Sequence, residues 1–264
     1  MEHLRKHGGK LIFSYLIGFL MLSLLNIILM TENMVLLSMI APPLTAVLVL
    51  AFYLLYYGGA ANITISAIYK DDSSISLFFK GVYRNFWKLF KVHFLIAIMA
   101  AIPVILILTV ISRGNLTGTL LFSLFDMIFS ILFYLLLLYL SFFVSILVIK
   151  DQFKVWPALK KAFLSLKKEF RNILTAVLYT AGVQLFTAIS LTGIFLIIVI
   201  LFNLDQINNQ AMMVQLTYLG GMIFQSVFSF ALICGLPVFV KKYKDTIEPR
   251  LFPEPPASDA SEKN

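Results

Sequence analysis

Long apolar stretches separated by short polar segments dominate the sequence. A helix needs about 20 apolar residues to cross the roughly 30 Å of hydrocarbon in a bilayer. Six stretches meet this length, at 11–30, 34–57, 92–111, 120–149, 173–202 and 213–240. The pattern predicts an all-α fold, a polytopic membrane helix bundle of about six transmembrane helices that occupies residues 1–244.

The distribution of lysine and arginine over the connecting segments predicts the orientation. If both termini lie inside, 20 of the 21 basic residues face the cytoplasm, and Arg113 is the exception. The opposite orientation places those 20 residues on the wrong side of the membrane. We therefore expect both the N-terminus and the C-terminus to be cytoplasmic.

Proline marks two further features. Pro42-Pro43 is expected to break or kink the second predicted span near its outer end. The segment 245–264 holds four of the nine prolines together with Glu, Asp and Ser, so we expect a disordered cytoplasmic tail.

The two long basic segments each predict an amphipathic helix in the membrane interface, over about 75–91 and 157–171. On the first, Phe79, Val82, Tyr83, Phe86 and Phe90 form an apolar stripe beside the cations Lys80, Arg84, Lys88 and Lys91. On the second, Leu159, Ala162, Phe163, Leu166 and Phe170 form the apolar stripe beside Lys160, Lys161, Lys167, Lys168 and Arg171. Each helix is expected to run on into the following span.

The two helices correspond at a spacing of about 80 residues, with Phe79-Lys80-Gly81-Val82-Tyr83 matching Leu159-Lys160-Lys161-Ala162-Phe163. Each lies between an outside-to-inside span and an inside-to-outside span, as in parallel repeats related by an axis along the membrane normal. Internal duplication and chance similarity of two basic connectors both fit this pattern.

Phe78-Phe79-Lys80-Gly81, Asn85-Phe86-Trp87-Lys88-Leu89 and Ala158-Leu159-Lys160-Lys161-Ala162-Phe163 carry a family resemblance. Over roughly 57–178, the sequence resembles bacterial membrane families that include the YesL-like proteins and the membrane domain of some glycerophosphodiester phosphodiesterases. The resemblance implies a six-helix protein of a bacterial cytoplasmic membrane. It implies no settled activity, and no soluble segment here is long enough to hold the hydrolase domain.

Composition agrees with a lipid environment. Of the 264 residues, 60% are hydrophobic and 13% are charged, and the mean hydropathy is +0.93. A soluble fold of this size has too little interior to hide so much apolar surface. The net charge of +8 does not indicate nucleic-acid binding, because the same cations are expected to face the bilayer. Membrane lipids, especially anionic ones, and a membrane or cytoplasmic protein are the expected partners.

Three of the polar residues inside predicted spans are candidates for a functional role. Asp126 is either a transport or proton-coupling residue or a charge at the outer interface. Gln184 and Gln225 lie near mid-depth, where amides either join helices or line a path for a polar substrate.

The sequence shows no known catalytic, nucleotide-binding or metal-binding motif, so we expect no enzymatic activity and no cofactor. The leading hypothesis is an integral membrane protein with an accessory, lipid-contacting or assembly role. The alternative is a small transporter or permease component.

Overall fold

The computed structural model describes residues 2–31, 42–114, 120–201 and 227–252. Within these ranges the regular secondary structure is helical, which confirms the prediction of an all-α fold. In chain order the helices are α1 (Glu2–Thr31), α3 (Pro42–Lys70), α4 (Ile75–Gly114), α5 (Leu120–Ile149), α6 (Val155–Lys168), α7 (Phe170–Leu201), a helical segment over 227–234, α9 (Leu236–Lys242), the π-helical turn η2 (Tyr243–Ile247) and α10 (Glu248–Leu251).

Three stretches of the described chain are long and apolar enough to cross a membrane: Ile75–Ile105, Phe125–Ile149 and Phe170–Ile194. They overlap the third, fourth and fifth predicted spans. The most apolar part of α5 is 56% buried inside the protein, compared with 17% for α4 and 28% for α7. Helix α5 is therefore the most central of the three, whereas α4 and α7 turn most of their apolar surface outward.

Buried rings fill the place where the helices meet. Tyr57 of α3 stacks on Phe142 of α5 with 5.9 Å between ring centroids, and Phe142 meets Phe239 of α9 edge-on at 5.6 Å. Phe143 contacts Tyr243 of η2 in the same way, at 5.3 Å. These contacts join α3, α5 and the C-terminal helices into one core.

Glycine allows α3 and α4 to pack closely. A Cβ atom added at Gly81 would lie 2.7 Å from the carbonyl oxygen of Gly58 and 3.1 Å from the Cα of Gly59. The first turns of α4 lie directly on the backbone of α3 here, and only glycine leaves room for this contact. This contact fixes the part of α4 that the sequence predicts to be amphipathic.

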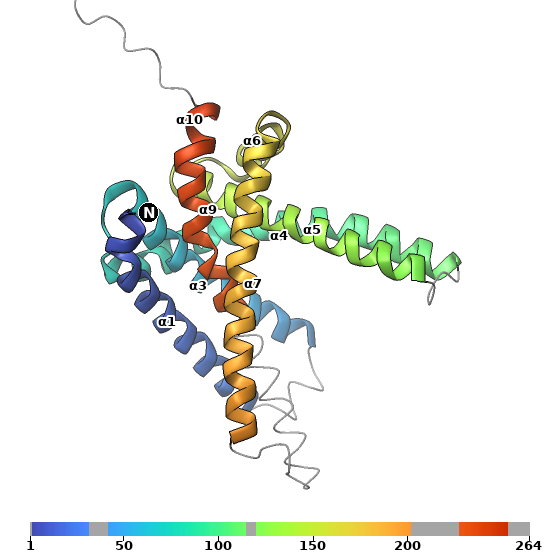
Figure 1. The fold of residues 1–264 in the computed structure, drawn as a ribbon, viewed down its shortest axis with the longest axis horizontal. Coiled ribbons are helices and arrows are strands. Elements are labelled where there is room, and N and C mark those ends of the chain that lie inside the picture. Colours follow the sequence, from blue (N-terminus) through green and yellow to red (C-terminus); the bar gives the residue numbers. More distant parts are fainter. Residues whose placement is uncertain (1, 32–41, 115–119, 202–226, 253–264) are drawn as a thin grey trace, which may run out of the picture.

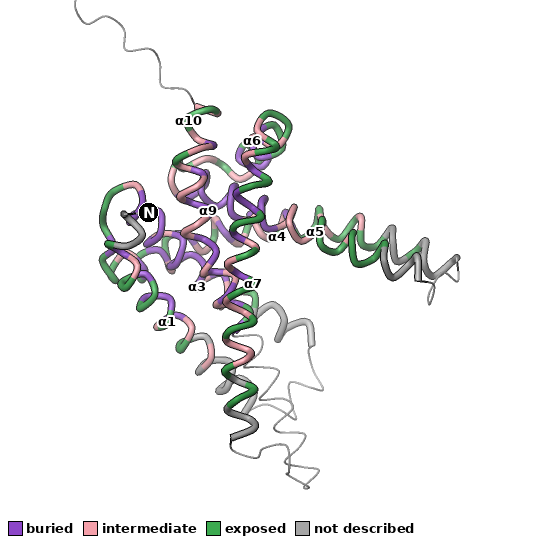
Figure 2. The backbone as a smooth tube through the Cα atoms, in the orientation of Figure 1, coloured by how far each residue is buried: buried purple, intermediate pink, exposed green. Residues whose placement is uncertain are grey.

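The outer parts of the helices extend away from this core. Helices α4 and α5 run side by side and project in one direction, while the outer half of α7 projects in another (Figure 1). Burial follows the same division, because the residues where the helices meet are buried and those on the projecting halves are mostly exposed (Figure 2). The described helices therefore pack together in one core and diverge beyond it.

Helix α4 begins at Ile75 and continues as one helix through Pro103, which confirms that the first amphipathic helix runs on into a span. Its 40 residues extend about 60 Å, twice the thickness of the hydrocarbon. The second amphipathic helix behaves differently. Helix α6 ends at Lys168 and α7 begins at Phe170, so the prediction that this helix runs on was wrong. Glu169 lies between them with φ −122° and ψ 33°, outside the helical region.

Two expectations about proline and the tail also change. Pro42-Pro43 begins α3, where a missing N–H group costs nothing, so these residues do not interrupt a described helix. The predicted tail begins at Asp245, yet the structure continues in helical form to Leu251, and Ile247 is completely buried. The rest of the predicted tail, 253–264, lies outside the described residues.

The connectors before α4 and α6 are alike. Asp71 in the first and Gln152 in the second both adopt a φ of 56°. The following helices begin at Ile75 and Val155, about 80 residues apart, which is the spacing of the two basic stripes. The two connectors and the helices that follow them therefore correspond in backbone conformation as well as in sequence.

Candidate functional site

Helix α4 carries three stripes in its first half. At about 100° per residue, positions three and four apart share one face of a helix. The stripe that packs against α3 consists of Phe78, Gly81, Asn85, Leu89 and Val92, all buried. The aromatic and basic stripes share the remaining surface and point away from the core.

The aromatic stripe is exposed in spite of its size. The exposed fraction is 80% for Tyr83 and 67% for Trp87, and Phe79 and Phe94 are also exposed. Further along, Phe90 stacks on Phe94 with 6.0 Å between centroids. Amphipathic aromatic side chains are enriched where a membrane meets water, and this stripe has the composition of such a contact.

The basic stripe lies beside these rings. Lys80, Arg84 and Lys91 are exposed, and no carboxylate of the described chain lies within ion-pair distance of them. Lys88 differs, because its ammonium group donates a hydrogen bond of 2.5 Å to Oε1 of Gln152 in the next connector. Three of the four predicted cations are therefore available to an anionic partner, and the fourth joins α4 to the connector before α6.

Helix α6 repeats the arrangement on a smaller scale. Leu159 and Ala162 are buried, but Phe163 and Phe170 are exposed, so only part of the predicted apolar stripe faces the protein. Trp156, which the stripe did not include, is 68% exposed. The exposed cations of α6 are Lys160, Lys167 and Lys168, whereas Phe170 and Arg171 of the predicted stripes fall on α7, where both are exposed. We call the exposed aromatic and basic residues of each helix its basic-aromatic face.

Lys161 is the exception on α6. Its ammonium group lies 3.3 Å from the ring centroid of Phe252 and 4.9 Å from that of Phe153. Burial lowers the pKa of Lys161 below its usual value, and Asp151 partly offsets this effect. This lysine therefore helps to hold the C-terminal helices in place and is not part of the exposed surface.

The C-terminal helices close the same end of the molecule. The Glu248 carboxylate pairs with Lys150, and it accepts a hydrogen bond of 2.5 Å from the Tyr69 hydroxyl. Lys244 donates a hydrogen bond of 2.5 Å to the carbonyl oxygen of Ile68. The end of α3, the connector after α5 and the C-terminal helices are thus bound together next to the basic-aromatic faces.

The N-terminus is fastened by a contact that the sequence did not reveal. The ring of His7 lies 2.6 Å from Oδ1 of Asp71 through Nε2 and 2.7 Å from Oγ of Ser73 through Nδ1. Lys6 also pairs with Asp71. These residues form a Ser-His-Asp chain, but Ser73 is only 3% exposed, which leaves its hydroxyl no room to meet a substrate. The chain joins α1 to the first connector.

The predicted intramembrane polar residues have separate environments. Asp126 is exposed at the outer end of the α5 stretch, which agrees with a charge at an interface. Gln184 is 3% exposed, and both polar atoms of its amide are hydrogen-bonded: Oε1 accepts a bond of 2.8 Å from Tyr134, and Nε2 donates one of 2.8 Å to the Leu232 carbonyl. These bonds make Gln184 a link between three helices. Gln225 lies outside the described residues.

A small polar cluster lies inside the bundle instead, and no sequence pattern pointed to it. Nε2 of His93 on α4 lies 3.0 Å from Oγ of Ser141 on α5, and the His93 ring meets Tyr57 edge-on at 5.4 Å. The buried Tyr57 and Ser145 hydroxyls lack a hydrogen bond of good geometry. His93 therefore packs against both α3 and α5.

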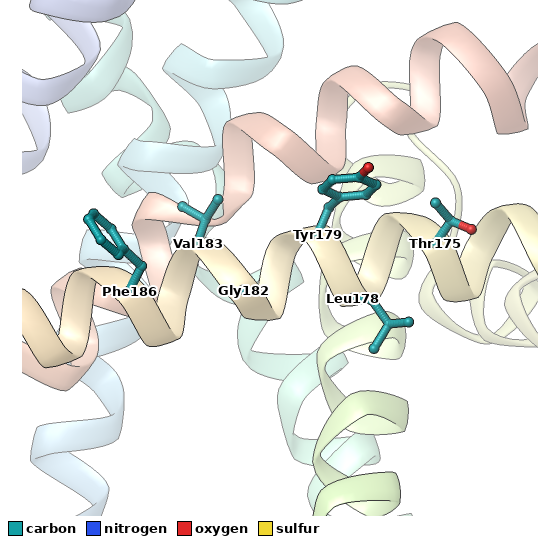
Figure 3. A pocket seen from close by; sticks show the side chains of 6 residues that line it. All are labelled: Thr175, Leu178, Tyr179, Gly182, Val183 and Phe186. Carbon is teal, nitrogen blue, oxygen red and sulfur yellow. The ribbon is translucent and has the colours of Figure 1, made fainter.

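A pocket of about 480 Å³ lies on the outer side of α7. One face of α7 lines it, from Thr175 through Tyr179 and Gly182 to Phe186 (Figure 3). The lining is almost entirely apolar. No three His, Cys, Asp or Glu side chains gather anywhere in the described chain as a metal site requires.

No protein-family model matches this sequence, and neither the curated proteins nor the solved structures contain a match. The side chains and their contacts therefore indicate what the protein does.

Proposed function

We propose that this chain is a non-enzymatic integral membrane protein with an accessory or assembly role, in which the basic-aromatic faces of α4 and α6 contact anionic lipid. One observation carries the proposal. On both helices, large exposed rings lie beside exposed cations: Tyr83 and Trp87 beside Arg84 and Lys80 on α4, and Trp156 beside Lys160 on α6.

Physical chemistry favours a lipid surface as the partner of these faces. A basic residue near an anionic leaflet contributes roughly 1 kcal/mol, and tryptophan and tyrosine rings settle at the depth of the headgroups. In water, an exposed aromatic stripe gains no hydrophobic free energy, because each ring remains hydrated. A headgroup layer satisfies both kinds of side chain at once.

The proposal includes six transmembrane helices in a bacterial cytoplasmic membrane, with both termini in the cytoplasm. It is supported by the three apolar stretches and by the position of the basic residues at the ends of these stretches. Crossing one bilayer together requires α7 and the α4–α5 pair to lie more nearly parallel than in Figure 1. Large apolar side chains of the outer part of α7 whose burial is described, including Phe186, Ile189 and Ile194, are exposed, so they offer little packing against that rotation.

The test neutralises the available cations of α4 in a triple variant, Lys80→Gln, Arg84→Gln and Lys91→Gln. Protein is purified from nanodiscs that contain equal amounts of phosphatidylglycerol and phosphatidylcholine, and the retained lipids are measured by mass spectrometry. At roughly 1 kcal/mol per cation, the three cations contribute about 3 kcal/mol, so we expect the ratio of retained phosphatidylglycerol to phosphatidylcholine to fall by about two orders of magnitude.

Lys88→Gln is the matched control, because Lys88 already donates to Gln152 and contributes less to the exposed surface. It removes one positive charge from the same helix. We expect the change in the lipid ratio to be much smaller than one third of the three-cation effect on a logarithmic scale. An unchanged ratio in the triple variant would contradict the proposal.

A small transporter is the second candidate, and the polar cluster of Tyr57, His93, Ser141 and Ser145 favours it. Buried hydroxyls without good hydrogen bonds are places where water or a polar solute binds. If this cluster conducts, proteoliposomes should show solute flux that Tyr57→Phe and Ser145→Ala reduce. Flux equal to that of empty vesicles, across ions and small metabolites, would remove this candidate.

A further inference from the structure

The pocket on α7 has the length and direction of a site for one lipid chain. Its lining runs along a single face from Thr175 to Phe186 (Figure 3). These 11 residues of rise correspond to about 16 Å, which is close to half of the roughly 30 Å of hydrocarbon. The pocket therefore spans about one leaflet.

Gly182 creates the hollow in the middle of this face. A Cβ atom placed there would meet no heavy atom within 4 Å. Val183 and Leu178 line it on either side, and Phe186 ends it toward the outer part of α7. An extended apolar chain fits such a shallow channel, because it buries apolar surface without a polar partner.

Two cations lie near the end of the channel where its lining begins, at Thr175 and Tyr179. The Lys242 ammonium group lies 5.1 Å from the ring centroid of Tyr179, which is a lining residue. Arg171 is exposed one turn before Thr175, whose hydroxyl donates to the Arg171 carbonyl. No carboxylate in the described part of the chain pairs with Lys242 or Arg171. The surface of α7 is therefore cationic near Arg171 and Lys242 and becomes apolar toward Phe186.

We propose that this channel binds one anionic phospholipid, with its phosphate at Lys242 and Arg171 and one acyl chain along Gly182 to Phe186. The inference rests on the proposed lipid-contacting function and assigns it a discrete site beyond the basic-aromatic faces. Charge complementarity selects this occupant, because a packed transmembrane helix would leave both cations without an anion, whereas a phospholipid supplies the anion and the chain together.

The test uses phosphatidylglycerol with a photoreactive diazirine on one acyl chain, in vesicles that hold the full-length protein. Labelled peptides are mapped by mass spectrometry. We expect labelling on residues 175–186, and we expect a phosphatidylcholine probe to label them much less. Lys242→Gln should lower labelling by phosphatidylglycerol about fivefold.

Gly182→Leu fills the channel and should lower labelling about tenfold or more. Gly193→Leu is the matched control, because Gly193 also has no atom within 4 Å of an added Cβ but does not line the pocket. Both variants should elute as wild type does in detergent. Lys242→Gln tests the site independently if Gly182→Leu fails to fold.

Three results would overturn the site: equal labelling by phosphatidylcholine, unchanged labelling in Gly182→Leu, or cross-links that place residues 202–226 or a second copy of the chain in the channel. If labelling at α7 fails while the triple variant of α4 still loses phosphatidylglycerol, this site is wrong and the proposed function stands. If neither variant has an effect, both fail.

Discussion

Gly81→Ala is the substitution whose effect follows most directly from the fold. Helix α4 reaches α3 so closely at this position that a methyl group would overlap the backbone, at 2.7 Å from the Gly58 carbonyl oxygen. The nearest atom is the Cβ of Asn62, and no side-chain rotation moves this atom or the backbone of Gly58 and Gly59. The two helices must separate, and the basic-aromatic face of α4 must move with them.

Two opposing terms set the magnitude. Alanine favours a helix over glycine by about 1 kcal/mol. Overpacking a close contact costs typically about 1–3 kcal/mol, and this contact is with rigid backbone, so the upper part of that range applies. The expected net result is a loss of about 1–2 kcal/mol in the free energy of unfolding.

Gly9→Ala makes the same chemical change where nothing opposes it. Gly9 is exposed on α1, and an added Cβ would meet no atom within 4 Å. Stability should therefore rise by up to about 1 kcal/mol. Both variants are measured by reversible unfolding in mixed micelles of SDS and a mild detergent, with helicity followed by circular dichroism.

The two substitutions should thus shift the unfolding midpoint in opposite directions. If Gly81→Ala is as stable as Gly9→Ala, α3 and α4 do not pack as described, and the outward direction of the α4 rings loses its structural basis.

Three further predictions concern the links between helices. Gln184→Leu should destabilise the protein by about 1–3 kcal/mol in the same unfolding assay, because it orphans the Tyr134 hydroxyl and a buried carbonyl; an unaffected midpoint would show that the amide bonds are not formed. Glu248→Gln should speed trypsin cleavage after the already exposed Arg250, because it loosens the C-terminal helices that the Glu248 carboxylate holds through its ion pair with Lys150 and the hydrogen bond from Tyr69; cleavage at the wild-type rate would contradict those contacts. Burial first, and then Glu248, raises the pKa of Tyr69 above its usual value of about 10. The folded protein therefore keeps a proton that the unfolded chain releases, so stability should fall as the pH rises above about 10, and less steeply in Tyr69→Phe.

Features set by local composition were predictable from the sequence. The bounds of α5 match the fourth predicted span, a long apolar run in which Asp126 is the one charged residue, and the start of α4 follows from the helical spacing of its rings and cations. The exposure of three of its cations also follows, because charged side chains avoid the interior.

Features set by contacts between distant segments were not predictable. The break at Glu169 interrupts a sequence with good helical propensity, and it coincides with an ion pair between Glu169 and Arg250 at 3.5 Å. His7 meets Asp71 across 64 residues of chain, and no local pattern reports such a meeting. The burial of His93 depends in the same way on α5 packing beside α4.

The chain holds two tryptophans, Trp87 and Trp156, and both lie on basic-aromatic faces with about two thirds of the side chain exposed. Intrinsic fluorescence therefore measures the depth of these faces without a label, using Trp87→Phe and Trp156→Phe to separate the two signals. In bilayers with phospholipids brominated at shallow or deep acyl positions, we expect blue-shifted emission that shallow bromine quenches more than deep bromine. Emission typical of water, quenched by aqueous iodide and untouched by brominated lipid, would show that these faces do not meet the membrane.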